Sequence, residues 1–304
     1  MGTSSPYGGP GGDTPLVPTW LDGGGGPPPQ IPDGAPSPDG HTDPANPIPG
    51  SGSPGGPVPP RIPPGPRLPI PTPPPRRFSA ARTNFSKFAA SGGSDRKSLG
   101  RAISGYVTTA SGGSKIAAQR MGASRSAGAR LVGFLSDATS RGAQTALRSL
   151  NLEALAGRPV EEVFLGLADY VCPNDGTVDE AIARDAFLET IADLASSGIT
   201  DLDAMTGDQI QTVFELYSTH AIEARICNDI GTKVVTFPTD VQAAHNVQNQ
   251  LRDFIRRGVA DALTRARAEL DNLTPDRVFE FVGGVYESAF SILEALGAQE
   301  AEEE

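Results

Sequence analysis

The sequence predicts an all-α helical bundle that follows a long, disordered, Pro/Gly-rich N-terminal tail. The tail is indicated by composition, since 41 of the first 75 residues are Pro or Gly. Such a segment cannot bury enough apolar surface to offset the entropy of ordering it. The bundle is indicated by apolar residues at helical spacing from residue 149 onward, without any alternation of strand and helix patterns.

The tail divides into a tip, residues 1–21, and a spacer, residues 22–75. The tip holds the only tryptophan of the chain within a small apolar cluster. The spacer ends in a proline-rich run that favours polyproline II, and at about 3.1 Å per residue it could span on the order of 160 Å. Arg-flanked PxxP spacings in this run also fit a polyproline-binding domain, although a plain spacer needs the same composition.

Residues 76–148 form a basic segment that we expect to be partly helical and to dock on a partner. It carries thirteen Arg or Lys against two Asp, whereas residues 149–304 carry a net charge of −19. Ser94 is predicted to cap a first helix, which Gly112 and Gly113 end. The predicted contact residues for nucleic acid or an acidic partner are Arg76, Arg77, Arg82, Lys87, Arg96, Lys97 and Arg101.

Residues 149–296 are predicted to be an acidic α-helical domain, followed by a frayed acidic tail at 297–304. The expected helix starts are Pro159, the Thr177–Glu180 capping box, Thr206, Asp240 and Thr274-Pro275. A β-branched run at residues 233–237 is the one candidate strand.

The sequence gives no sign of catalysis, of a metal site or of a cofactor. His41 lies in the tail, and His220 and His245 are interpreted as surface or half-buried histidines because no ligand or nucleophile stands at a matching spacing. Cys172 and Cys227 are interpreted as buried thiols. Because the sequence shows no catalytic signature, we expect that the protein is not an enzyme. Because it shows no candidate membrane helix, secretory signal or acylation motif, we expect a cytoplasmic protein.

The basic segment admits two interpretations. Its cations could contact phosphates, with Phe78, Phe85 and Phe88 stacking on bases. Alternatively, the segment docks on an acidic protein surface, including the acidic domain of this same chain.

The tip suggests an N-terminus that another protein handles. Methionine is normally removed before glycine, and the exposed α-amine of Gly2 would have a pKa near 7.7–8.0, so part of it is a neutral nucleophile at cellular pH. The predicted recognition residues follow Gly2 in the tip: Thr3, Ser4, Ser5, Tyr7, Leu16, Val17, Trp20 and Leu21. The alternative is an ordinary chain start followed by disorder.

The run GTSSPYGGPGGDTPLVPTWL from Gly2 to Leu21, with a proline-rich spacer and an Ala-rich helical body that ends in acidic residues, resembles the B component of the bacterial Qat anti-phage defence system. The tip carries the specific part of this resemblance. The resemblance implies a non-enzymatic subunit whose operon partners are an ATPase, an enzyme similar to the deazaguanine synthase QueC, and a TatD-like nuclease.

The resemblance also implies a role for each part of the chain. The QueC-like partner would join a deazaguanine carboxylate to the amine of Gly2, and the helical body would dock the ATPase. Two alternatives remain from the sequence: a nucleic-acid-binding adaptor that acts through residues 76–148, or a plain scaffold whose tail only binds.

Overall fold

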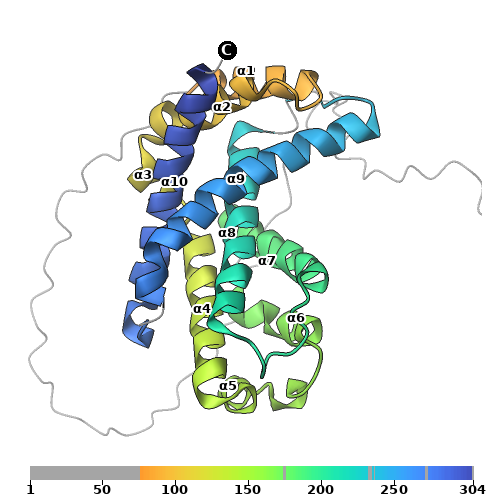
Figure 1. Cartoon of the computed structure of the whole chain (residues 1–304), viewed down its shortest axis with the longest axis vertical. Coiled ribbons are helices and arrows are strands. Elements are labelled where there is room, and N and C mark those ends of the chain that lie inside the picture. The colour runs from red at the N-terminus through yellow and green to blue at the C-terminus, as the bar shows by residue number, and fades with distance from the viewer. Residues whose placement is uncertain (1–75, 174–175, 232–234, 236, 271–272, 303–304) are drawn as a thin grey trace, which may run out of the picture. The chain divides into compact units, whose positions relative to one another are not determined.

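The computed structural model describes residues 76–173, 176–231, 235, 237–270 and 273–302 (Figure 1). Within these residues the predicted all-α bundle is confirmed, and all of them belong to one structural unit. The predicted tip and spacer lie outside the described residues. The helices are α1 (Ser79–Ala90), α2 (Arg96–Gly105), the π-helix η1 (Tyr106–Ser111), α3 (Ser114–Gln119), α4 (Gly122–Arg141), α5 (Ala143–Ser149), the 3₁₀-helix η2 (Glu153–Leu155), α6 (Val160–Val171), α7 (Val178–Ser197), α8 (Gly207–Ile230), α9 (Val241–Leu270), the 3₁₀-helix η3 (Pro275–Arg277) and α10 (Val278–Glu302).

Most helix starts lie where the sequence predicts them, because side-chain caps are local. Thr177 forms the predicted capping box with Glu180, and Thr206 forms another with Gln209. Asp240 accepts a hydrogen bond from the amide of Ala243 at 2.8 Å, at the start of α9.

The predicted cap of α2 is wrong by one residue. Asp95, not Ser94, accepts the amide of Ser98 at 2.9 Å. The glycine break is confirmed, since Gly112 and Gly113 take positive φ angles of 90° and 102° between η1 and α3. The candidate strand is not found in the described part of its segment, which is Val235 and Phe237.

The predicted division at residue 148 does not correspond to a break in the core. One cluster of buried apolar side chains contains Phe85 and Leu99 from the basic segment together with Phe164 and Phe254 from the acidic one. Apolar side chains of the basic segment therefore pack against the rest of the same chain. The buried apolar faces of both segments complete a single core.

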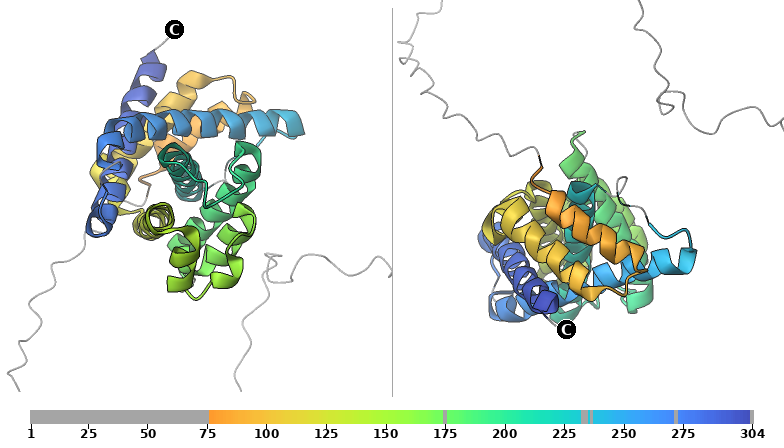
Figure 2. Two further views of the ribbon diagram at one scale, coloured as in Figure 1. Left: turned by 60° about the horizontal axis from the view of Figure 1, so that its bottom comes forward. Right: turned by 90° about the horizontal axis from the view of Figure 1, so that it is seen from above.

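Helix α10 is central to the packing. It contacts α2, α3 and α4 along one side and α9 along another, and α8 lies between α7 and α9 (Figure 1). Figure 2 shows α1 and α2 side by side, with α10 next to α2. The backbones of α2 and α10 nearly touch, because a Cβ added at Gly100 would lie 2.6 Å from the carbonyl oxygen of Gly297.

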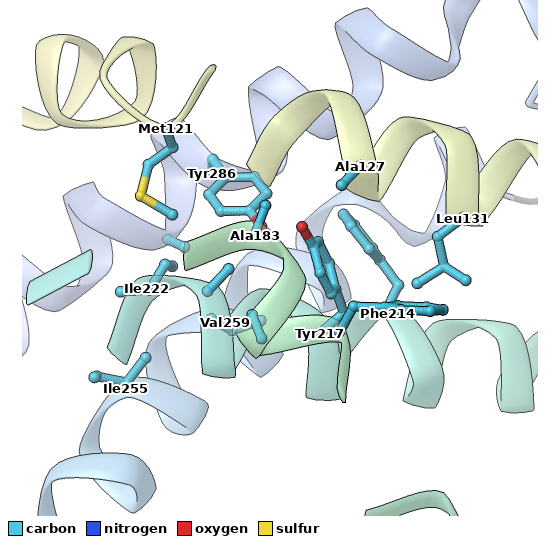
Figure 3. Packing of buried hydrophobic residues seen from close by; sticks show 14 of the residues in the cluster. Met121, Ala127, Leu131, Ala183, Phe214, Tyr217, Ile222, Ile255, Val259 and Tyr286 are labelled. Atoms are coloured by element: carbon cyan, nitrogen blue, oxygen red, sulfur yellow. The ribbon is translucent and has the colours of Figure 1, made fainter. Parts of the chain in front are cut away.

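Helix α4 also packs closely against aromatic rings of α8. The Tyr217 hydroxyl donates to the carbonyl of Ser124 at 3.0 Å, and the ring lies beside α4 (Figure 3). A Cβ added at Gly128 would lie 3.2 Å from Phe214 and 3.3 Å from Tyr217. Gly128, which lowers the intrinsic helicity of α4, therefore makes room for these rings.

The predicted frayed tail at 297–304 is wrong for its described part. Helix α10 continues through Glu302. Glu300 accounts for this extension, since it forms ion pairs with Arg96 of α2 and Arg257 of α9.

Candidate functional site

The first described residues after the tail are fixed to the helical body by a group of side chains that we call the arm anchor: Phe78, Arg82, Tyr106, Arg120 and Asp229. We call residues 1–75 the arm. The ring of Phe78 stacks on Tyr106 with centroids 5.8 Å apart, and the guanidinium of Arg120 lies 5.6 Å from the Phe78 ring. The Nε of Arg82 donates to the carbonyl of Ile230 at 2.6 Å. Phe78 and Arg82, which follow the arm, thus contact η1, the end of α3 and α8.

Asp229 is the charged centre of the arm anchor. Its Oδ2 accepts the hydroxyl of Tyr106 at 3.0 Å and lies 3.3 Å from Nε of Arg225 and 3.5 Å from Nη2 of Arg120. The Asp229 side chain is only 9% exposed. Arg225 also pairs with Asp179 at the start of α7. Four elements, η1, the end of α3, α7 and α8, therefore meet around one carboxylate that is largely buried.

Tyr106 remains a hydrogen-bond donor to this carboxylate. Burial raises the pKa of Tyr106, and the negative charge of Asp229 raises it further. Because a deprotonated Tyr106 would oppose Asp229 in a region that water hardly reaches, the phenol keeps its proton at physiological pH.

The seven predicted cationic contact residues differ in their environments. Arg76, Lys87 and Arg101 are exposed and Lys97 is half-buried. Arg77 lies over the ring of Phe78, at 4.6 Å from its centroid. The remaining two, Arg82 and Arg96, bind other parts of the chain, the carbonyl of Ile230 and the carboxylate of Glu300. Part of the basic charge is therefore used inside the protein.

The stacking role predicted for the aromatic residues is wrong for two of the three. Phe85 is 1% exposed and Phe88 is 0% exposed, since both belong to the core. Phe78 is half-buried against Tyr106. A base could not stack on Phe85 or Phe88 without opening the core, so these two rings provide no platform for single-stranded nucleic acid.

Glu300 joins α2, α9 and α10. Arg96 donates to both of its oxygens at 3.1 Å, and Arg257 donates to Oε1 at 3.0 Å. Burial alone would raise the pKa of Glu300, but hydrogen bonds from Arg96 and Arg257 outweigh it and hold the pKa below the usual 4.5.

This lowered pKa predicts a pH-dependent contribution to stability. Because the folded-state pKa lies below the unfolded one, the contribution is complete above pH 4.5 and is lost as the pH falls through the folded-state value. The stability difference between the wild type and Glu300→Gln should therefore be constant near neutral pH and shrink in acid. Urea midpoints measured across the pH range test this. Glu287→Gln, an exposed change on the same helix, should show no such trend.

The histidines and cysteines occupy different environments. The interpretation of His220 as a surface or half-buried residue is wrong: it is 4% exposed, and its Nε2 lies 2.8 Å from Oδ2 of Asp193. His245 is exposed, as predicted, and His41 lies outside the described residues. Burial raises the pKa of both thiols to about 12, so Cys172 and Cys227 stay protonated and unreactive at neutral pH.

In the part of the chain that the structure describes, no group of three or more His, Cys, Asp or Glu could hold a metal ion. Within the same part, no helix is long and apolar enough to cross a membrane.

A groove of about 660 Å³ lies between α4, α6 and the start of α10. We call it the α4–α10 groove. Aromatic and apolar side chains from these elements and their flanking loops line it: Phe134, Leu150, Tyr170, Leu273, Pro275, Val278 and Phe279. Arg130, Asp137 and Arg141 are its charged lining residues. Its volume falls within the roughly 300–1,000 Å³ of typical ligand sites.

The predicted modification site Gly2 and the predicted recognition residues of the tip lie outside the described residues. The sequence interpretation missed the arm anchor and the α4–α10 groove. Arg225 and Asp229 did carry a signal, since they stand four residues apart on α8 among the buried Ile222, Ile226 and Ile230. A charged pair on an apolar helix face requires partners from elsewhere in the fold.

Comparisons with known proteins give one match. No curated protein and no solved structure matches the chain. Residues 112–293, more than half of the chain, match the family described as Qat anti-phage system associated protein QatB. This match extends from just after η1 almost to the end of α10. It includes Arg120 and Asp229 of the arm anchor together with Arg225. The chain therefore belongs to the QatB family and is a component of a Qat anti-phage defence system.

Proposed function

We propose that this protein is a non-enzymatic, cytoplasmic subunit that presents its N-terminal arm to a QueC-like enzyme of the same operon. The helical body docks the ATPase partner, and a TatD-like nuclease is a further partner. The arm anchor is the observation that supports this proposal. In this proposal the terminus is presented from a fixed base, and contacts of Phe78 and Arg82 attach the base of the arm to η1, the end of α3 and α8.

The proposed chemistry belongs to the partner enzyme. ATP activates the carboxylate of a deazaguanine, with release of pyrophosphate. The neutral amine of Gly2 then attacks the activated carbonyl carbon, an amide bond forms, AMP leaves and the amine loses a proton. Glycine suits this step because it has no side chain that would obstruct a narrow active site.

The body offers an exposed apolar surface for a partner on the hairpin of α6 and α7. Arg184 of α7 and Asp169 of α6 pair at 2.8 Å. Leu165 and Leu188 each stand one helical turn away from this pair, on α6 and α7 respectively. These leucines are 56% and 42% exposed. Exposed apolar side chains of this kind are what a protein interface covers.

A nucleic-acid-binding adaptor is the second candidate. The exposed Arg76, Lys87 and Arg101 favour it, since each can contact a phosphate. It ranks second because Phe85 and Phe88 are buried and Arg82 and Arg96 are engaged within the chain.

The experiment that tests the proposed function is a mass measurement. The intact protein and its N-terminal peptide are compared after production alone and together with the operon neighbours. We expect a mass gain confined to Gly2, and only when the neighbours are present. An unmodified Gly2 in both samples would contradict the proposal and would favour a scaffold whose tail only binds.

Two variants serve as controls for this measurement. A retained N-terminal extension masks Gly2 while it leaves residues 3–21 in place, so it should abolish the mass gain and the phage protection that depends on it. Deletion of residues 2–21 removes both the acceptor and its recognition residues. Binding of the enzyme by the extended chain but not by the deletion would separate recognition from modification.

A further inference from the structure

The α4–α10 groove contains aromatic side chains that remain partly exposed. Phe279 is 50% exposed and Tyr170 is 38% exposed, and both line the groove. Phe279 does not belong to the face of α10 that packs in the core, which contains the buried Val278, Phe281 and Val282. Large apolar side chains gathered around a concave surface indicate a binding site rather than chance exposure.

We propose that the occupant of the α4–α10 groove is the tip of the same chain, residues 15–21. This proposal goes beyond the modification of Gly2, because docking requires no covalent change. The segment reads PLVPTWL and combines two prolines with the apolar side chains of Leu16, Val17, Trp20 and Leu21.

The chemistry of the segment matches the lining of the groove. Proline-containing segments dock on aromatic-lined grooves because their extended conformation has little entropy left to lose. Phe134, Tyr170 and Phe279 supply the aromatic lining, and Pro275 extends the apolar surface. Trp20 is the largest apolar side chain of the arm and the only tryptophan of the protein.

The charges of the two partners are complementary. Asp13 and Asp22 stand on either side of the apolar segment. Arg130, Asp137 and Arg141 are the charged residues of the groove lining, and Arg141 pairs with Asp137, so the net positive charge of the lining comes from Arg130. A further cation, Arg125, lies 5.1 Å from the centroid of the Phe279 ring. Arginines beside an aromatic groove favour an acidic segment over a basic one.

The arm is long enough to place its tip anywhere on the helical body. The spacer of 54 residues at 22–75 would span about 40 Å on average as a flexible chain and far more when extended. The longest helix, α9, has 30 residues and is about 45 Å long. Because a tether of this kind gives an effective concentration near the millimolar range, even a weak contact would be occupied.

Trp20 provides the test, since no other tryptophan contributes to the emission of the full-length protein. We expect its emission to be blue-shifted and protected from acrylamide relative to a synthetic peptide of residues 2–21. Phe279→Ala and Tyr170→Ala should each return the quenching constant toward the value of the peptide. Leu165→Ala removes an equally exposed side chain outside the groove and should change nothing.

Three results would overturn the proposal. The first is emission and quenching of Trp20 in the wild type equal to those of the peptide. The second is protection of Trp20 that persists in both groove variants, which would place the tip elsewhere. A shift that disappears on dilution would show that the tip binds a second copy of the chain. Far-UV circular dichroism of each variant establishes that the helices remain formed. None of these readouts depends on whether Gly2 is modified.

Discussion

Replacing Asp229 by alanine is expected to destabilise the helical body by about 3–5 kcal/mol, the usual cost of removing one partner of a buried ion pair. For a domain of this size the melting temperature should fall by roughly 6–20 °C. This is the largest effect that we expect from a single side chain, because Asp229 has a 9% exposed side chain and three partners.

The physical reason is that Asp229 neutralises two guanidinium groups of limited exposure, since the side chains of Arg225 and Arg120 are 10% and 21% exposed. Without its carboxylate, Arg120 loses the one carboxylate that contacts it in the described structure, and the hydroxyl of Tyr106 loses its acceptor. Arg225 keeps Asp179. An unpaired buried charge costs several times more than the pair contributed, which explains why the expected loss exceeds that of an ordinary salt bridge.

Urea unfolding of the wild type, Asp229→Ala and a matched control measures this effect. Asp169→Ala is the control, since that aspartate also pairs with an arginine but its side chain is 90% exposed. The control should lose less than about 1 kcal/mol. Similar losses in the two variants would show that the carboxylate of Asp229 is solvated and that it does not organise the arm anchor.

The capping boxes and Asp229 show which contacts can be predicted from the sequence. The capping boxes at Thr177 and Thr206 depend on residues three apart, so local pattern suffices to find them. Asp229 depends on Tyr106, which is 123 residues away. The local sequence places Asp229 among isoleucines that are buried, but it does not identify the distant partners that its carboxylate contacts.

The same limit applies to the end of the chain and to the groove. Residues 297–302 resemble a frayed acidic tail until Arg96, 204 residues before Glu300, is known to bind it. The α4–α10 groove is formed by three elements whose exposed residues, such as Tyr170 and Phe279, look like single surface exceptions in sequence. Helix formation is local, whereas these sites arise from the packing of helices against one another.

Replacing Gly100 by alanine is expected to destabilise the junction of α2 and α10 by about 3 kcal/mol, toward the upper end of the usual cost of overpacking. A Cβ at this position would lie 2.6 Å from the carbonyl oxygen of Gly297 and 2.9 Å from Cβ of Glu300. The first of these is a backbone atom, so the helices must move apart. The reciprocal change at Gly297 would bring a Cβ within 2.7 Å of the Gly100 carbonyl oxygen.

Gly284→Ala is the matched control for this prediction. Gly284 also lies within a helix, but a Cβ there has no neighbour within 4 Å. Alanine should therefore stabilise α10 at this position by about 0.5–1 kcal/mol through its higher helix propensity. Opposite signs for the two glycine substitutions, measured by chemical unfolding, would attribute the loss to the helix contact and not to the change of residue type. A loss below about 0.5 kcal/mol for Gly100→Ala, of the size seen for ordinary surface changes, would contradict the close approach.

The Gly100 substitution also tests whether the arm requires a fixed base. Helices α1 and α2 pack on each other and connect the arm to the rest of the body, while α10 holds α2 from the other side. If α2 separates from α10, hydrogen exchange should increase in α1 and α2 before it increases in α7 and α8. Phage protection should then fall even though residues 2–21 are unchanged. Full protection by a variant whose α2 has separated from α10 would mean that the arm works as a simple tether, and the arm anchor would then serve stability alone.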